Sequence, residues 1–327
     1  MSILRAERLK AYYITEIFGI KRTVRAVDEV SMDVDNNEIL GIAGESGCGK
    51  STLIKALLGI VKPPLTILGG EVNYNLGDKR FNIFSLSQKE SKNIRWEYIS
   101  YIPQSSMSVL NPVRRIRDSF KSFINAHKKM GKGEFNSLVE EHLNVLGLPI
   151  EVLNAYPHQL SGGMRQRVTI ALATILRPKV IFADEPSTAL DVVVQRGVIQ
   201  LLKDIQQEQK NTIILVTHDM AIHANICDRI AIMYAGKIIE EAKTEEIFKH
   251  PLHPYTKYLI GSLPRIGDKS YRVSAPGSPP PLSNLPPGCS FHPRCPYTTE
   301  RCKSDNPSLV EVENNHKVAC FLASKEG

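Results

Sequence analysis

Three segments of the chain contain runs of consecutive apolar residues instead of alternating apolar and polar positions. They are EILGIA at 38–43, KVIFAD at 179–184 and NTIILVTH at 211–218. Such runs are typical of parallel strands that helices cover on both faces. Each is followed by a turn and a helical pattern, and after the first run one helix face carries Leu53, Ile54, Leu57 and Leu58. This alternation of strand and helix predicts an α/β fold of the doubly wound kind.

Two other regions differ from this pattern. From about 112 to 160 the apolar spacing is helical, and the predicted apolar side carries Leu138, Leu143, Val145 and Leu146. We expect a helical subdomain there, over about 105–165, with the basic stretch 114–129 as a solvated helix face. After about 250 the composition changes, and 276–287 contains six prolines. That segment cannot be a central strand or a helix interior, so we expect it to run extended over a surface, in a second domain that begins near 250.

Composition and charge add limits. Apolar residues make up 42% and charged residues 23%, which is ordinary for a globular protein. The first residues lack the apolar core of a signal peptide, and the longest apolar run, 168–176, is about half of what a bilayer requires. We therefore expect a cytoplasmic protein unless a partner holds it at a membrane. The net charge of +7 fits anionic ligands, lipid headgroups or nucleic acid, but a mildly basic solvated surface is the preferred explanation.

The stretch GESGCGKS at 44–51 fits the pattern G-x-x-x-x-G-K-[ST] and stands between a strand and a helix, as a phosphate-binding loop requires. Its glycines let successive backbone N–H groups point inward, and the following helix contributes its N-terminal dipole. Lys50 is expected to reach the β- and γ-phosphates of a nucleotide, Ser51 to bind Mg²⁺, and Thr52 to add a phosphate contact. The predicted nucleotide-binding stretch is Gly44, Glu45, Ser46, Gly47, Cys48, Gly49, Lys50, Ser51 and Thr52.

A second part of the predicted site, which is acidic, lies at the end of the run 179–184. Asp184 and Glu185 follow four apolar residues, so the strand end presents two adjacent carboxylates. In a P-loop protein the first is expected to hold Mg²⁺, usually through water, and the second to polarise the attacking water. Together with the P-loop, this pair indicates hydrolysis of a nucleoside triphosphate.

The stretch LSGGMRQRV at 160–168 resembles the signature motif of ABC ATPases. Ser161 can cap the helix that begins there, and Gly162 and Gly163 expose backbone N–H groups to an anion. The resemblance implies that this motif closes over the γ-phosphate held by a partner's P-loop, so that two chains enclose two ATP molecules. It also implies the ABC ATPase fold, in which a RecA-like core is joined by an antiparallel β subdomain and a helical subdomain. Met164 replaces the more common glutamine, which should matter little because serine and the glycine backbone make the phosphate contacts.

Other family elements follow in order. Tyr13 stands where an aromatic ring stacks on adenine, with Tyr12 as the rival assignment. Gln104 resembles the glutamine that contacts Mg²⁺ and the attacking water, and STALD at 187–191 resembles a dimer-contact loop. His218, at the end of the third run, resembles the switch histidine that contacts the γ-phosphate. The resemblance to ABC ATPases covers residues 1 to about 250.

A narrower resemblance covers the rest. The stretches 105–113, 187–195, 233–242 and 250–264, with the Pro/Cys-rich tail, are similar to ATPase subunits of oligopeptide and dipeptide importers. This implies a peripheral protein on the cytoplasmic face of the cell membrane, bound to two transmembrane permease subunits and to a paralogous ATPase subunit or a second copy. An extracytoplasmic solute-binding protein would deliver the peptide. We expect an ABC nucleotide-binding domain over 1–250 and an importer-type extension over 251–327.

Other functions remain possible from the sequence. Members of the same branch move oligosaccharides or nickel complexes. A soluble ABC ATPase acting on nucleic acid or ribosomes usually has two cassettes or a long coiled-coil insertion, whereas this chain has one cassette and a short insertion, so no nucleic-acid partner is expected. An iron–sulfur redox sensor that binds ATP would not need every element of hydrolysis.

Four of the six cysteines lie close together near the end of the chain, at Cys289, Cys295, Cys302 and Cys320. Cys48 lies in the P-loop, and Cys227 is expected to be a small buried apolar residue on a helix. A reducing cytoplasm disfavours disulfides, and structural zinc sites favour closer cysteine pairs than these. Four thiolates on irregular loops suit a [4Fe–4S] cluster, which some importer ATPases with this tail carry. Zinc, with His292 or His316 as substitute ligands, and an empty reduced tail are the alternatives.

Overall fold

The computed structural model describes residues 2–104, 109–188, 190–263, 274–313 and 315–323. The chain divides into two compact units, of which unit 1 comprises residues 1–35, 40–85 and 216–327, and unit 2 comprises residues 36–39 and 86–215. Part of the importer-like stretch 105–113 lies outside the described residues. Within the described ranges, no helix is both long and apolar enough to span a bilayer.

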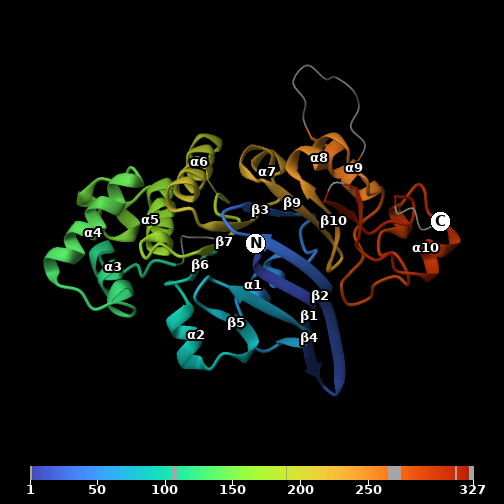
Figure 1. Ribbon diagram of the computed structural model, residues 1–327, viewed down its shortest axis with the longest axis horizontal. Helices are drawn as coiled ribbons and strands as arrows, with labels where there is room; N and C mark the ends of the chain where they lie inside the picture. The colour runs from blue at the N-terminus through green and yellow to red at the C-terminus, as the bar shows by residue number, and fades with distance from the viewer. Residues whose placement is uncertain (1, 105–108, 189, 264–273, 314, 324–327) are drawn as a thin grey trace. The chain divides into compact units, whose positions relative to one another are not determined.

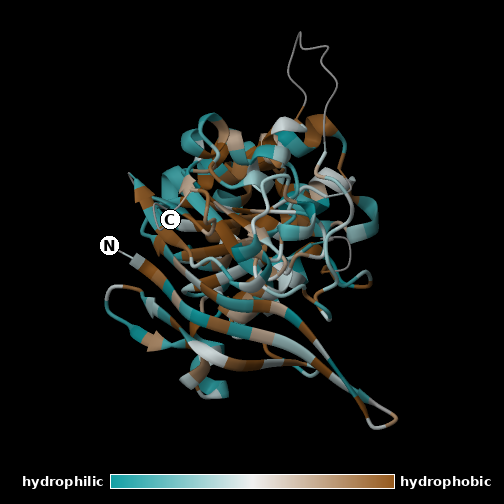
Figure 2. Ribbon diagram, turned by 90° about the vertical axis from the view of Figure 1, so that its right-hand side faces the viewer, coloured by the Kyte–Doolittle hydropathy of each residue, from teal (hydrophilic) through white to brown (hydrophobic). Residues whose placement is uncertain are grey.

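Unit 1 begins with a sheet of four antiparallel strands in the order β2-β1-β4-β5. Its two longest strands form a hairpin, blue in Figure 1. Figure 2 shows apolar and polar positions alternating along these strands, as expected where one face is covered and the other is open. The bounds are β1 Ser2–Ile17, β2 Ile20–Asp35, β4 Leu65–Asn75 and β5 Arg80–Asn82, with the 3₁₀ turn η1 at Ile83–Ser85. This sheet is the antiparallel β subdomain that the family resemblance implied.

Unit 1 also contains a mixed set of strands in the order β11-β12-β10-β9-β3. Strand β3 is parallel to β9, whereas β9, β10, β12 and β11 pair antiparallel. The strands are β3 Ile39–Ala43, β9 Arg229–Tyr234, β10 Lys237–Lys243, β11 Val310–Glu313 and β12 His316–Val318. The C-terminal extension thus adds two short strands to the edge of β10. The helices are α1 Lys50–Leu57, α7 Met220–Ile226, α8 Thr244–Lys249, α9 Pro254–Gly261, α10 Glu300–Ser304 and the 3₁₀ turn η5 His292–Arg294.

Unit 2 contains strands in the order β8-β7-β6, with β6 parallel to β7. All five residues of β7 and of β8 are buried, which is why their sequences are continuously apolar. The strands are β6 Ile99–Ile102, β7 Val180–Asp184 and β8 Thr212–Val216. The helices are α2 Gln88–Ile94, α3 Ile116–Asn125, α4 Lys132–Val145, α5 Gly162–Thr174 and α6 Val192–Gln209, with the 3₁₀ turns η3 Ile150–Asn154 and η4 Pro157–Gln159.

The three predicted strands are confirmed, and so is the apolar face of α1. The predicted face of α4 is wrong in part, because Val145 is 43% exposed and Leu138 is only half-buried. The buried side of this helix carries Phe135, Val139, His142 and Leu143, a stripe at helical spacing that includes a polar residue. His142 is accommodated because its Nε2 lies 2.9 Å from Thr174 Oγ1 of α5.

Candidate functional site

The loop 44–49 joins β3 to α1 and has a backbone that favours glycine. Gly44 has φ 152° and Gly49 has φ 113°. A Cβ on Gly44 would lie 2.1 Å from the Met233 carbonyl oxygen, and one on Gly49 would lie 2.0 Å from the Ala26 carbonyl oxygen. Backbone oxygens cannot retreat as a flexible side chain can, so both positions require glycine. The loop leads directly into α1, whose free N–H groups and dipole favour an anion at this end.

Lys50, the first residue of α1, folds back over the loop. Its side chain is buried, and Nζ donates to the carbonyl oxygens of Gly44 at 2.7 Å and Glu45 at 2.9 Å. The ammonium group is therefore held at the mouth of the loop, where a phosphate would meet it. Burial raises the pKa of the Cys48 thiol, so that side chain is neutral and fills space beneath the loop. Ser51 and Thr52 follow on the first turn of α1.

The two rival tyrosines of β1 make different contacts. The hydroxyl of Tyr13 lies 3.2 Å from Thr52 Oγ1, beside the phosphate loop. The hydroxyl of Tyr12 instead donates to Asp28 of β2, and burial and that carboxylate raise the pKa of Tyr12 well above its ordinary value. Successive residues of a strand point to opposite faces, so only one of the two can serve the loop. The contact with Thr52 favours Tyr13.

The predicted carboxylates stand at the end of β7 in unit 2. Asp184 is buried, and one of its oxygens accepts a hydrogen bond from the Tyr101 hydroxyl at 3.3 Å. Glu185 has a positive φ of 47°, which turns the chain away from the strand. Its Oε2 accepts from Gln104 Nε2 at 2.9 Å and from Thr188 Oγ1 at 2.9 Å. The structure thus brings Gln104 and Glu185 together, from residues far apart in sequence, into one polar group.

The stretch 160–168 forms the start of α5 in unit 2. Ser161 is the N-cap, and its hydroxyl accepts from the Met164 N–H at 3.2 Å, which confirms the capping expected from the sequence. Gly162 and Gly163 form the first turn, where backbone N–H groups lack partners within the helix. His218 lies in unit 1, just after β8, and is exposed.

The predicted residues are therefore divided between the units. Unit 1 holds the phosphate loop, Tyr13 and His218, and unit 2 holds Gln104, Asp184, Glu185 and the N-terminus of α5.

The four cysteines of the extension line one small cavity. Cys289, Cys295, Cys302 and Cys320 surround it together with His253, Phe291 and His292. Burial and the nearby thiols of Cys302, Cys320 and Cys295 raise the pKa of Cys289 to about 11. Burial also raises the pKa values of Cys295 and Cys320. Four thiolates at this place need a cationic centre between them, because each disfavours ionisation of the others.

A single-ion site is not what the described residues form. Among them, no group of three or more His, Cys, Asp or Glu side chains is placed to hold one metal ion. His316 is engaged elsewhere, since its Nε2 lies 2.7 Å from Glu240 Oε1, so it is not available as a ligand. His292 does face the cavity, and its Nδ1 lies 3.0 Å from the Cys289 carbonyl oxygen. Cys227 is buried as expected, but it is the C-cap of α7 and does not lie within the helix. Its Sγ lies 3.4 Å from His223 Nδ1.

Sequence reasoning missed the residues that attach the extension. Glu240 of β10 is fully buried and accepts from the backbone N–H groups of Leu252 at 2.7 Å and His253 at 2.9 Å, as well as meeting His316. Burial raises the pKa of Glu240, but these hydrogen bonds outweigh it and hold the pKa below its usual value. Two adjacent glutamates inside the apolar strand KIIEEAK were the available signal. Arg294 and Tyr255 were also missed, and both contact Glu45 of the phosphate loop.

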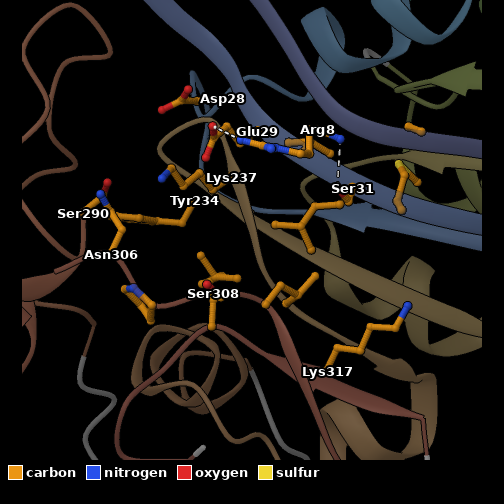
Figure 3. A pocket seen from close by; sticks show the side chains of 18 of the residues that line it. Arg8, Asp28, Glu29, Ser31, Tyr234, Lys237, Ser290, Asn306, Ser308 and Lys317 are labelled. Carbon is orange, nitrogen blue, oxygen red and sulfur yellow. Dashed lines mark hydrogen bonds and ion pairs between the residues drawn. The ribbon is translucent and has the colours of Figure 1, made fainter. Parts of the chain in front are cut away.

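A larger cavity of about 560 Å³ lies elsewhere in unit 1, beside strand β2 and the extension. Figure 3 shows its labelled side chains, including Arg8 next to Glu29 and Ser31. Several of its charges are paired, since Glu29 contacts Arg8 at 3.3 Å and Lys10 at 2.8 Å. Its described lining residues do not include the loop 44–49. The phosphate loop, and not this cavity, is therefore the candidate catalytic centre.

The fold and the site define a P-loop nucleotide hydrolase with the helical signature of ATP-binding cassettes. Two family models match the chain, "ABC transporter" over residues 27–188 and "Oligopeptide/dipeptide transporter, C-terminal region" over residues 239–302. The dipeptide transport ATP-binding protein DppD of Caldanaerobacter subterraneus is 42% identical over 98% of this chain and 97% of its own length. The protein of the same name from Escherichia coli is 36% identical over 98% of this chain and 96% of its own.

Comparison with solved structures also indicates an ATP-binding cassette. A dimeric post-hydrolysis state of the ATP-binding cassette MJ0796, bound to ADP and Pi, matches with a TM-score of 0.62 and 26% identity, over 74% of this chain and 98% of that one. The chain belongs to the family of ABC transporter ATP-binding proteins. Its reaction is ATP hydrolysis.

Proposed function

We propose that this chain hydrolyses ATP to power the uptake of di- and oligopeptides through an ABC importer. The observation that supports the substrate most strongly is the match over nearly the whole chain, tail included, to proteins named for dipeptide transport. Both alignments extend over the Pro/Cys-rich tail as well as the cassette, since each covers 98% of this chain. Import of oligosaccharides or nickel complexes by the same machine is the second candidate.

Each predicted residue has a role that its chemistry supports. Lys50 and the N–H groups of the loop hold the phosphates, and Tyr13 stacks on adenine. Ser51, Gln104 and Asp184 would hold Mg²⁺, which neutralises phosphate charge. Glu185 takes part in proton transfer from the attacking water, and Gln104, bonded to Glu185, keeps that carboxylate oriented. His218 contacts the γ-phosphate.

We propose that Ser161, Gly162 and Gly163 serve the ATP of a partner chain. The capped N-terminus of α5 is an anion site, and a match to a dimeric cassette supports its use across a dimer interface. The partner is a paralogous ATPase or a second copy. Two permease subunits would hold the pair at the cytoplasmic face of the membrane, and a solute-binding protein would deliver the peptide.

The substrate is tested in cells that lack the chromosomal gene. Uptake of a labelled dipeptide, an oligosaccharide and Ni²⁺ is compared after complementation with the wild-type chain or Lys50→Ala. Dipeptide uptake restored by the wild type alone supports the proposal. Restored uptake of the sugar or of Ni²⁺, with dipeptide uptake unaffected by the deletion, would replace it with the second candidate.

We propose that the cysteine cavity holds a [4Fe–4S] cluster, which supplies no reaction step but fixes the extension. The proposal is supported by the placement of all four thiols around one small cavity. The reason to prefer the cluster to zinc is the spacing of the cysteines along the chain, since structural zinc sites favour closer cysteine pairs. Cys289, Cys295, Cys302 and Cys320 would each supply one thiolate to hold the cluster. It would stabilise a segment too small to form its own core.

Anaerobically purified protein should be brown, absorb broadly and contain about four irons per chain. Cys295→Ser should lose the iron, and the control Cys227→Ala, which lies outside the cavity, should keep it. A colourless anaerobic preparation with one zinc per chain would replace the cluster with a zinc module.

We further propose the domain division expected from the sequence, with the nucleotide-binding domain over 1–250 and the extension over 251–327. Support comes from the second family model, which begins at residue 239, and from the helices α3, α4 and α5 that lie between β6 and β7, where a helical subdomain over about 105–165 is proposed. Limited proteolysis tests this, since the first stable fragment should end just beyond residue 250.

A further inference from the structure

We propose that Arg294 of the C-terminal extension is a positioning residue for the phosphate loop. It acts through Glu45 and makes the affinity for ATP depend on the folded extension. The proposal rests on the loop binding ATP, and it goes beyond a structural role for the tail.

The contact between Arg294 and Glu45 has the geometry of a two-point clamp. Nη1 of Arg294 donates to Glu45 Oε2 at 3.0 Å, and Nη2 donates to Glu45 Oε1 at 3.1 Å. Paired bonds of this kind fix direction as well as distance. The arginine side chain is only 6% exposed and that of Glu45 is 30% exposed. The arginine is therefore shielded from the solvent that weakens most surface ion pairs, whereas Glu45 is partly exposed.

Arg294 is itself held rigidly by the extension. Its Nε donates to the Pro276 carbonyl oxygen at 2.8 Å, and Nη2 also contacts the Ala275 carbonyl oxygen at 3.4 Å. Its guanidinium lies over the rings of Tyr234 and Phe291, 5.8 Å from each centroid. The residue directly precedes Cys295, in the short turn η5. The arginine is thus fixed by the proline-rich segment and by the turn next to the cysteine cavity.

Glu45 is anchored at its backbone as well. Its N–H donates to the Tyr255 hydroxyl at 2.9 Å, and its carbonyl oxygen accepts from Lys50 Nζ at 2.9 Å. Tyr255 belongs to α9 and packs against Tyr234, with ring centroids 4.7 Å apart. Two of the residues that anchor Glu45, Arg294 and Tyr255, therefore come from beyond residue 250.

This anchoring bears directly on phosphate binding. The N–H groups that receive phosphate follow Glu45 along the loop, which is rich in glycine and has many conformations when free. Fixing Glu45 at side chain, N–H and carbonyl restricts the empty loop to few of these conformations. Binding then costs less ordering of the loop, so the extension raises affinity by preorganisation.

The decisive variant is Glu45→Ala, because it leaves every residue of the extension in place. If the carboxylate acted only as a charge, its removal near an anionic ligand would tighten ATP binding. Positioning predicts the opposite, a Kd for ATP raised roughly five- to twentyfold, since the clamp is lost. Arg294→Gln should weaken ATP by a similar factor, and the double variant should be no weaker than Arg294→Gln alone, because both changes remove one clamp.

Binding is measured by titrating the full-length chain with a fluorescent ATP analogue and competing it with ATP. Arg301→Gln is the matched control, an arginine of the extension that pairs with Asp305 and stacks on Phe321. It should bind ATP like the wild type. Arg294→Lys, which keeps the charge without the fork, should recover only part of the affinity. In assays with the partner subunit, Arg294→Gln should raise the KM for ATP while its kcat changes less than about twofold.

Two outcomes would overturn the proposal. One is a Glu45→Ala chain that binds ATP as tightly as the wild type or more tightly. The other is a double variant whose loss equals the product of the two single losses. If Arg294→Gln unfolds the extension, Glu45→Ala still decides. The nucleotide site itself would be refuted by a different outcome: a wild-type chain that does not bind ATP, or one whose ATP binding survives in Lys50→Ala.

Discussion

Replacing Glu185 by glutamine removes the charge expected to act on the attacking water and changes little else. In the structure Oε2 of Glu185 accepts from Gln104 and Thr188, both at 2.9 Å. A glutamine has the same length, and its amide oxygen can still accept from one of these donors. The phosphate loop belongs to the other unit and is not altered. The substitution should therefore separate catalysis from binding.

The magnitudes follow from these contacts. Losing a positioned general base costs on the order of a hundredfold or more in kcat, or about 2.7 kcal/mol of transition-state stabilisation. Folding should change far less. A hydrogen bond to a charged group contributes about 1.5–3 kcal/mol and a neutral one about 0.5–1.5 kcal/mol. Glu185 is partly exposed, so water replaces much of what is lost, and we expect at most about 2 kcal/mol of destabilisation.

The assay measures phosphate release at saturating ATP in the presence of the partner ATPase, together with the Kd for ATP and the melting temperature. Glu208→Gln, an exposed change of the same chemistry on α6, is the control and should behave like the wild type. Turnover of Glu185→Gln within threefold of the wild type, with ATP binding intact, would refute the assignment of Glu185. Loss of ATP binding in this variant would show that the residue acts on the loop instead.

Three further predictions concern single residues. Burial lowers the pKa of His142 from 6.5 to about 4; this group therefore contributes stability above pH 6.5 that is lost as the pH falls toward 4, on the order of 3 kcal/mol. The variant His142→Gln, which can still bond Thr174, should show a shallower loss of unfolding free energy over that window, and an unchanged slope would contradict this. Ser161→Ala should cost about 1 kcal/mol of stability through the lost cap and should also slow ATP hydrolysis, whereas Ser161→Gly should recover most of the stability and none of the rate; equal rates for Ser161→Gly and the wild type would exclude a role for the hydroxyl. Tyr13→Ala should raise the Kd for ATP roughly tenfold through lost stacking while Tyr12→Ala leaves it near the wild-type value, and the reverse order would assign the adenine contact to Tyr12.

The features that could be predicted from the sequence are those marked by an unbroken apolar run or by a specific motif spacing. Strands β3, β7 and β8 are apolar from end to end because they are buried on both faces, and the phosphate loop has a spacing that few other structures require. Strand β6 was missed because four residues, Ile99–Ile102, cannot be told from a buried piece of helix by periodicity.

The prediction of the buried face of α4 was wrong in part for a related reason. Leu138 and Val145 are seven residues apart beside the true stripe, so their spacing looks helical while one of them faces solvent. The true stripe contains His142, which an apolar pattern leaves out. Only the Thr174 hydroxyl, across the chain on α5, makes that position suitable for a histidine.

The contacts of the extension were beyond sequence reasoning because they join residues far apart along the chain. Arg294 meets Glu45 across 249 positions, and His316 meets Glu240 across 76. The sequence marks Glu240 as unusual, because it lies inside an apolar strand, but it does not identify the distant partner of either acidic residue. The cysteines could be grouped by sequence because they cluster there, and the structure places all four around one cavity.

The central claim is that ATP hydrolysis by this chain drives peptide import. The most direct test purifies the tagged chain with the membrane proteins it brings down, reconstitutes them in vesicles with ATP enclosed, and adds the solute-binding protein with a labelled dipeptide outside. We predict uptake that requires enclosed ATP, is accompanied by phosphate release, and is lost together with it in Glu185→Gln. Uptake that persists in Glu185→Gln, or hydrolysis that no peptide uptake accompanies, would contradict the account.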